Sequence, residues 1–261
     1  MRRNFTNRNF KNRNLVGIKY SLVGLLGLVL QTSACGAALL GALIAVTPQA
    51  VACPCETYNK KPEELDKKAE EISGSVMRDG ISYTKSSQYK KDFARCMASA
   101  RKACLDYLKE HPGADNMAVV SDIDETILDN RDYYKTTDKF VWKDFVKWVR
   151  LAKAPPLKPS ADFLKWARSK GFAVFLVTGR MEELKAPTIK NLVRANVAYD
   201  GIYFRNQGDR RSAIEIKTAV RKQIEDLGFT IVVNMGDQMS DMVGGHAIDC
   251  EKLPNKLYVI D

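Results

Sequence analysis

One short stretch constrains this chain more than any other. It is the apolar run Ala118–Val120, followed almost at once by carboxylates at Asp122, Asp124 and Glu125. The run has the composition of a buried parallel strand. Because alternate side chains of a strand share a face, Asp122 and Asp124 are expected to project to the same side where the strand ends. Like charges this close repel each other, and burying them without compensation is very costly. The stretch is therefore either a solvated acidic turn or part of a magnesium-dependent site.

From Met117 onward, apolar runs alternate with helical patterns. The expected strands are Met117–Val120, Phe172–Val177, Gly201–Phe204, Thr230–Val233 and Leu257–Ile260. Helices are expected between them, near residues 138–151, 159–170, 181–195, 212–228 and 239–245. Alternation at these lengths predicts an α/β fold, a Rossmann-like, doubly wound parallel sheet with right-handed crossovers and flanking helices.

The segment before this alternation is predicted to be helical. A charge run at Lys60–Glu71 places glutamates four residues before lysines, the favourable order on a helix. A second helix is expected from roughly Ser87 to Lys109. Its expected buried stripe consists of Tyr89, Phe93, Met97, Ala100, Cys104 and Leu108.

The formal net charge of +10 points to nucleic acid at first sight, but the excess is concentrated at the N-terminus. Residues 1–52 hold six basic residues and no acidic ones. The rest of the chain has 35 basic and 31 acidic residues, a balance of +4. A nucleic-acid polymer is therefore not expected as a partner.

The basic segment is followed by an apolar run of 26 residues, Ser21–Val46, and then by Pro48–Ala52, whose small residues fit a signal-peptidase site. The run is also long enough to span a bilayer. Cys35 and Cys53 each follow a small residue, as in lipoprotein cleavage sites. Residues 1–52 are therefore expected to be a signal peptide or a membrane anchor. The positive flank favours export of the rest of the chain, to the periplasm or to a membrane-anchored position that faces it.

Six cysteines fit an oxidising compartment. Cys96 and Cys104 lie eight residues apart on one expected helix, about 12 Å, which is too far for them to pair with each other. If Cys53 is lipidated, Cys55, Cys96, Cys104 and Cys250 remain, and four cysteines have three possible pairings. Free buried thiols are the equally weighted alternative.

Polar side chains follow three of the expected strands, at the edge of the sheet where sites form in such folds. They are Asp122 and Asp124 after the first strand, Thr178, Gly179 and Arg180 after the second, and Asp237 and Asp241 after the fourth. Lys217 falls in the first turns of the helix before the fourth strand. One strand ending in acids is weak support for a site, but three such strand ends form a constellation.

This constellation has a specific chemistry. Carboxylates are oxygen ligands suited to Mg²⁺, which would relieve the repulsion among them. An ionised aspartate beside such an ion can attack phosphorus and form an aspartyl-phosphate. The hydroxyl of Thr178 could bind a phosphoryl oxygen, and Lys217 could neutralise charge that develops there.

In order along the chain, these residues form DxDET at Asp122–Thr126, TGR at Thr178–Arg180, then Lys217, then GDQxSD at Gly236–Asp241. This order resembles the haloacid dehalogenase (HAD) superfamily. More closely it is similar to subfamily IIIB acid phosphatases, which include bacterial secreted or lipoprotein phosphatases and plant acid phosphatases. The resemblance covers about residues 60–261. It extends to Leu128-Asp129-Asn130, to aromatic positions in Phe140–Val149, to Lys217–Arg221 and to the closing run Lys252–Tyr258.

The resemblance implies a role for each residue. Asp122 is the implied nucleophile, and Asp124 is the implied general acid and base. The implied Mg²⁺ ligands are Asp122, the backbone carbonyl of Asp124, and Asp237, with Asp241 as a nearby acidic support. The implied phosphate-binding residues are Thr178, Gly179 and Lys217. Met239 departs from the family, which commonly has tryptophan there, and the departure concerns packing more than catalysis.

The insertion between the first two motifs holds several aromatic side chains. Phe145 and Trp148, at helical spacing, are expected in the core rather than in a binding wall. Tyr133 and Tyr134 are expected in a loop just after the site, where they could stack on an organic leaving group. Arg180 is open between a structural and a phosphate-facing role.

The chain is therefore expected to be an exported, Mg²⁺-dependent acid phosphatase that acts on small phosphomonoesters, nucleotides among them. A core over 116–261, with a small inserted cap at about 129–171, is expected to follow an N-terminal helical segment at 53–115. One alternative is a dedicated 5′-nucleotidase, which needs a specific base pocket. The other is a non-catalytic storage or binding protein, whose signature is a lost nucleophile or metal ligand. Neither residue is lost here.

Overall fold

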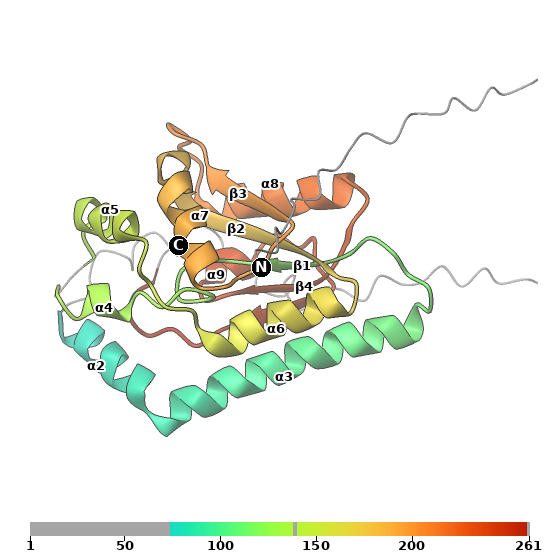
Figure 1. Ribbon diagram of the computed structural model, residues 1–261, viewed down its shortest axis with the longest axis horizontal. Helices are drawn as coiled ribbons and strands as arrows, with labels where there is room; N and C mark the ends of the chain where they lie inside the picture. Colours follow the sequence, from blue (N-terminus) through green and yellow to red (C-terminus); the bar gives the residue numbers. More distant parts are fainter. Residues whose placement is uncertain (1–73, 138–139, 260–261) are drawn as a thin grey trace, which may run out of the picture. The chain divides into compact units, whose positions relative to one another are not determined.

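The computed structural model describes residues 74–137 and 140–259, which fall within the compact unit Gln49–Asp261. Five strands form one parallel sheet with the order β3-β2-β1-β4-β5 (Figure 1). They are β1 (Met117–Ser121), β2 (Ala173–Met181), β3 (Gly201–Arg205), β4 (Thr230–Gly236) and β5 (Asp249–Lys252). The predicted α/β class with a parallel, doubly wound sheet is confirmed.

Helices cover both faces of the sheet. They are α2 (Gly74–Lys85), α3 (Ser87–Glu110), α4 (Arg131–Tyr134), α5 (Trp142–Leu151), α6 (Lys158–Ser169), α7 (Lys185–Arg194), α8 (Ala213–Asp226) and α9 (Met239–Met242), with a 3₁₀ turn at Glu182–Leu184. Helices α3 and α6 lie side by side on one face, and α8 packs on the other (Figure 1). The side chains of β1 alternate accordingly, with Val119 in the core under α3 and with Ala118 and Val120 in the core under α8.

The long helix α3 follows the predicted boundaries closely. Ser86 caps it, because its hydroxyl accepts a hydrogen bond from the amide of Tyr89 at 3.1 Å. Its buried residues are Tyr89, Phe93, Met97, Ala100 and Cys104, as the spacing predicted, and Leu108 is only partly buried. The helix ends at Glu110, before Gly113, whose φ of 83° favours glycine.

The fifth strand was predicted in the wrong place. Residues 257–259 of the expected strand Leu257–Ile260 are irregular, and the edge strand is β5 instead. The apolar residues Leu257 and Tyr258 belong to a loop near the C-terminus, and they are buried in the core without forming a strand. Strand β5 is polar, with the sequence Asp-Cys-Glu-Lys, and its pairing with β4 rests on backbone hydrogen bonds that no side-chain pattern announces.

Two helices are shorter than predicted. Helix α5 begins at Trp142 rather than near 138, and α9 ends at Met242 rather than near 245. Gly244 and Gly245, with φ of 95° and 70°, cannot continue a right-handed helix.

The expectations for the signal or anchor segment and for the charge run at Lys60–Glu71 lie outside the described residues. Among residues 74–137 and 140–259, no helix is long and apolar enough to cross a bilayer. Cys96 and Cys104 are free thiols, whereas Cys250 is disulfide-bonded. The three open pairings that included Cys96 and Cys104 are therefore wrong, and the alternative of free thiols holds for these two residues.

Candidate active site

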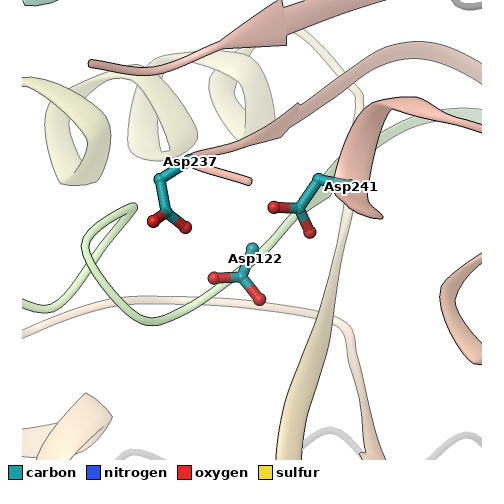
Figure 2. Close-up of side chains that lie close together, drawn as sticks. All are labelled: Asp122, Asp237 and Asp241. Carbon is teal, nitrogen blue, oxygen red and sulfur yellow. The ribbon is translucent and has the colours of Figure 1, made fainter. Parts of the chain in front are cut away.

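Three carboxylates converge at the carboxyl edge of the sheet (Figure 2). Asp122 follows β1 directly, Asp237 follows β4 directly, and Asp241 lies on the short helix α9. One oxygen from each lies within 4.8 Å of the others, and all three residues are buried. The amide of Asp122 donates to the carbonyl of Met235 at 2.9 Å, so the backbone pairing of β1 with β4 fixes the position of the first carboxylate.

Lys217, on helix α8, contacts this cluster. Its Nζ donates to Oδ1 of Asp122 at 2.8 Å and also forms a hydrogen bond with Asp241. Burial raises the pKa of Asp122 well above its ordinary value, and the neighbouring carboxylates add to this while Lys217 opposes it. Burial lowers the pKa of Lys217, but Asp122 and Asp241 outweigh that effect and raise it above its ordinary value. One ammonium group thus faces three buried carboxylates.

The carboxylate of Asp237 is held by amide side chains, while Lys252 donates to its backbone carbonyl at 2.5 Å. Its Oδ2 accepts hydrogen bonds from Asn255 at 2.6 Å and from Gln238 at 2.5 Å, and Oδ1 lies 3.4 Å from the hydroxyl of Thr126. Burial raises its pKa to about 6, the charge of Asp241 adds to this, and the amide hydrogen bonds oppose it. Asn255 belongs to the closing run Lys252–Tyr258, which therefore has a role in orienting a site carboxylate.

Asp241 packs so closely on β4 that residue 236 has to be glycine. A Cβ on Gly236 would lie 2.2 Å from Cγ of Asp241 and 2.3 Å from its Oδ2. That Oδ2 accepts the backbone amide of Gln238 at 3.0 Å in a capping box, and Oδ1 binds Lys217. Both oxygens of Asp241 are therefore engaged, which suits a supporting role.

Asp124 does not belong to the carboxylate cluster. Arg180 forks onto it, with Nε 3.0 Å from Oδ2 and Nη2 2.6 Å from Oδ1, and Asn130 donates to Oδ1 at 2.8 Å. The remaining Nη1 of Arg180 donates to Thr188 at 3.0 Å. Each nitrogen of this buried guanidinium therefore has a protein partner, so the structure favours a positioning role for Arg180 over a phosphate-facing one.

Thr178 and Gly179 lie beside this ion pair at the end of β2. Thr178 is buried, and its hydroxyl oxygen accepts the amide of Arg180 at 3.1 Å. Gly179 is exposed and lines the cavity described next, and a Cβ placed on it would meet no atom within 4 Å. The second motif thus brings one buried hydroxyl and one open backbone position to the site.

A cavity of about 400 Å³ opens above the carboxylates. Its charged lining residues include Asp122, Asp124, Asp237 and Lys217. Aromatic side chains line it elsewhere, namely Tyr134, Phe140, Trp142, Phe145 and Tyr258. We call Asp122, Asp237 and Lys217, together with Asp241, which binds Lys217 but does not line the cavity, the charged floor of the site, and the five rings its aromatic wall.

The aromatic side chains are placed differently from the prediction in one respect. Tyr133 and Tyr134 lie on helix α4 rather than in a loop, and both are buried. Tyr134 stacks on Tyr258 at 5.2 Å and lines the cavity, whereas Tyr133 does not line it. Phe145 and Trp148 are buried as expected, although Phe145 also reaches the cavity.

The donor set of the floor fits a divalent cation. Asp122 and Asp237 are hard oxygen ligands of the kind that Mg²⁺ prefers, and burial raises the pKa of each. When both carboxylates are ionised, the single positive charge of Lys217 does not compensate them, and a divalent cation would. The carboxylate of Asp124 is instead engaged by Arg180 and Asn130.

An α/β sheet with this edge of carboxylates, lysine and hydroxyl defines a protein of the HAD class. Residues 45–261 match the HAD superfamily, subfamily IIIB (acid phosphatase), and the chain belongs to that family. It is 35% identical over 148 residues to Acid phosphatase 1 of Solanum lycopersicum, a match that covers 54% of this chain and 58% of the tomato protein. It is 32% identical over 187 residues to the Stem 28 kDa glycoprotein of Glycine max, which covers 68% and 72% of the two chains.

A solved structure shares the fold. The Class C acid phosphatase from Bacillus anthracis superposes with a TM-score of 0.60 at 22% identity, over 71% of this chain and 86% of the bacterial chain. At this identity the likeness concerns the fold. The sequence resemblance to subfamily IIIB is confirmed by the family match.

Sequence reasoning left three supporting residues without a role. Asn130 joins Asp124 to Trp148, whose indole N–H donates to its amide oxygen at 2.9 Å. Asn255 orients Asp237, and Tyr258 donates to the buried carboxylate of Glu125 at 2.5 Å. All three lie in runs that match the family, and that match was the signal available for them.

Proposed function

We propose that this protein is an exported, Mg²⁺-dependent acid phosphatase that hydrolyses phosphomonoesters through an aspartyl-phosphate. The observation that carries the proposal is the floor itself, where Asp122 accepts a hydrogen bond from Lys217, lies within 4.8 Å of a carboxylate oxygen of Asp237 and lines a cavity large enough for an organic leaving group. Family membership supports the same reaction class. Buried opposite charges fixed around a reacting centre are the arrangement that stabilises phosphoryl transfer.

Asp122 is the proposed nucleophile. Lys217 binds its Oδ1, which leaves Oδ2 to attack phosphorus as the bond to the leaving oxygen breaks. Asp124 donates a proton to that leaving oxygen, then takes one from the water that attacks the aspartyl-phosphate, so phosphate is released and Asp122 is regenerated. Arg180 and Asn130 hold the carboxylate of Asp124 at the cavity during both steps.

The phosphoryl oxygens are proposed to bind Lys217, the hydroxyl of Thr178 and the backbone at Gly179. A magnesium ion held by the carboxylates of Asp122 and Asp237 and by the backbone carbonyl of Asp124 would neutralise charge on those oxygens. Asp241 supports the floor by fixing the Nζ of Lys217. This is the arrangement that the family resemblance implies for these residues.

Two other functions compete with this one. The aromatic wall favours a dedicated 5′-nucleotidase, since rings stack on a base. Relatives named as vegetative storage proteins of Arabidopsis thaliana, 25% and 29% identical over 147 residues, favour a storage protein. Against storage, this chain retains Asp122 and Asp237 in contact geometry.

A phosphate-release screen tests the proposal. The protein is assayed with phenyl phosphate, sugar phosphates and 5′-nucleotides, with Mg²⁺ and with EDTA. We expect release from several classes of ester with Mg²⁺ and almost none with EDTA. Release from nucleotides alone would establish the nucleotidase, and no release from any ester would favour the storage protein.

Export is the proposal's second part. It is supported by the basic flank and the apolar run Ser21–Val46. Fusion of a reporter that functions only in the cytoplasm to the C-terminus should give no signal. An active reporter would contradict export.

A further inference from the structure

One cationic side chain of the cavity has no task in the reaction described above. Arg205 is the last residue of β3 and lines the same cavity as Asp122 and Lys217. It pairs in register with Met181, two residues beyond Gly179. It therefore lies two strands from β1, roughly 10 Å at the usual strand spacing.

The guanidinium of Arg205 is fixed by backbone carbonyls. Its Nη2 donates to the carbonyl of Asp209 at 2.8 Å and to that of Arg211 at 2.7 Å, and Nε lies 3.2 Å from the carbonyl of Asp209. The carbonyls orient the group without neutralising its charge, which acts at longer range on the carboxylate of Asp209 and helps to lower the pKa of that carboxyl. The side chain is half-buried, so its position is defined before any ligand arrives.

The acidic residues nearest along the chain have other partners. The carboxylate of Asp209 binds Arg211 at 2.6 Å, and hydrogen bonds from Arg211 lower its pKa to about 2. The carboxylate of Glu215 accepts the amide and the hydroxyl of Ser212 at 2.8 and 2.9 Å. Among the described residues, Arg205 forms no ion pair, in contrast to Arg180, the other arginine of the cavity, which is paired with Asp124.

We propose that Arg205 forms a subsite for a second anionic group, so that the preferred substrates are phosphomonoesters whose organic part also carries a carboxylate or another phosphate. The inference rests on the proposed function, because it takes Asp122 and Lys217 as the place of the reacting phosphoryl group. The aromatic wall contacts the apolar part of such a substrate, and Arg205 contacts its far end. A charge-assisted hydrogen bond in this setting is worth about tenfold in affinity.

Two phosphonates test the subsite without turnover, because their carbon–phosphorus bond is not hydrolysed. Binding of benzylphosphonate and of 4-carboxybenzylphosphonate is measured by calorimetry at pH 7 with Mg²⁺ on the full chain. The probes differ only in the carboxylate. We expect wild type to bind the carboxylated probe about tenfold more tightly.

Three variants assign that preference to one side chain. Arg205→Gln should remove it, and Arg205→Lys should retain part of it because the charge remains. Arg210→Gln removes the same charge from an exposed residue of the same segment that does not line the cavity, and it should keep the preference in full.

The subsite is contradicted if wild type binds neither probe or binds both equally. It is also contradicted if Arg210→Gln loses the preference as fully as Arg205→Gln does. Equal weakening of both probes by Arg205→Gln would mean a disturbed loop and would likewise contradict it. The proposed function is tested separately by release of phosphate from phenyl phosphate. Hydrolysis of phenyl phosphate without a preference for the carboxylated probe would contradict only the subsite at Arg205. A preference for that probe without hydrolysis would contradict only the phosphatase activity.

Discussion

Asp122 on the floor of the cavity and Trp142 on its wall differ in almost every physical respect. Asp122 is 5% exposed and bonded to Lys217, whereas Trp142 is 40% exposed and packs against the rings of Phe140 and Phe145. Both line the same cavity. The floor is a set of mutually dependent charges, while the wall is a set of apolar contacts that is partly open to solvent.

In the proposed function, the floor therefore supplies the groups for the reaction, and the wall supplies contacts for binding the substrate. A buried charge is stable only with its partners in place, so a change in one floor residue affects the others. An exposed ring can change with little effect on folding. We therefore expect large, coupled effects at the floor and separable effects at the wall, which are small where the ring is exposed.

The largest effect is expected for Asp122→Asn. The amide keeps the shape of the side chain but is a poor nucleophile, so turnover should fall by at least about a thousandfold. Far-UV circular dichroism should be unchanged. The control is Asp132→Asn, an exposed aspartate of α4 that pairs with Lys135, and it should keep full activity. Comparable activity in the two variants would remove Asp122 from the mechanism.

Lys217→Gln is expected to lower stability as well as turnover. It removes the one ammonium group that faces Asp122 and Asp241, and breaking a buried ion pair costs about 3 kcal/mol. Urea unfolding in EDTA measures the loss without a divalent ion to compensate it. Lys222→Gln, on the exposed face of the same helix, is the matched control and should leave stability nearly unchanged, because solvent screens its ion pair with Asp226. Equal stability of the two variants would mean that the floor charges are not coupled.

On the wall, burial should decide the outcome. Phe145→Ala removes a buried ring and should cost about 3 kcal/mol of unfolding free energy. Trp142→Ala removes an exposed ring and should cost less than about 1 kcal/mol, while it raises KM for aryl phosphates severalfold with kcat nearly unchanged. A loss of kcat in Trp142→Ala equal to that of a floor variant would break the distinction between the two regions.

A further buried carboxylate, that of Glu251, does not line the cavity. Burial under α3 raises the pKa of Glu251 to about 7, Asp249 adds to this, and a hydrogen bond from Ser99 opposes it. Because the folded state favours the protonated form, its contribution to stability is complete below about pH 4.5 and is lost as the pH rises through 7. A pKa of about 7 against 4.5 corresponds to about 3 kcal/mol, so between those limits wild type should lose roughly 1 to 3 kcal/mol relative to Glu251→Gln once solvent screening is allowed for.

Urea unfolding of both proteins across this pH range measures the difference. Glu183→Gln, at an exposed glutamate, is the control and should run parallel to wild type. A constant gap between wild type and Glu251→Gln would show that this carboxylate does not change its charge on folding. The effect of burial on the carboxylates of the floor would then not extend to Glu251.

The parts of the molecule that follow from local pattern were predictable. The stripe of α3 repeats at three and four residues, and the acids follow β1 and β4 at the strand ends, so both features are written in neighbouring residues. The partner of Asp124 was not predictable, because Arg180 lies 56 residues away and its orientation depends on Thr188. Aromatic residues at helical spacing look alike in sequence, and only packing leaves Trp142 exposed while Phe145 is buried.

The most direct test of the central claim is to trap the covalent intermediate. Wild-type protein is quenched with acid during turnover of a phosphomonoester in Mg²⁺, and the peptides are mapped by mass spectrometry. The account predicts a phosphoryl group on Asp122, and no such group on this residue when the substrate is omitted. Rapid release of phosphate with no phosphorylated Asp122 at any quench time would contradict it.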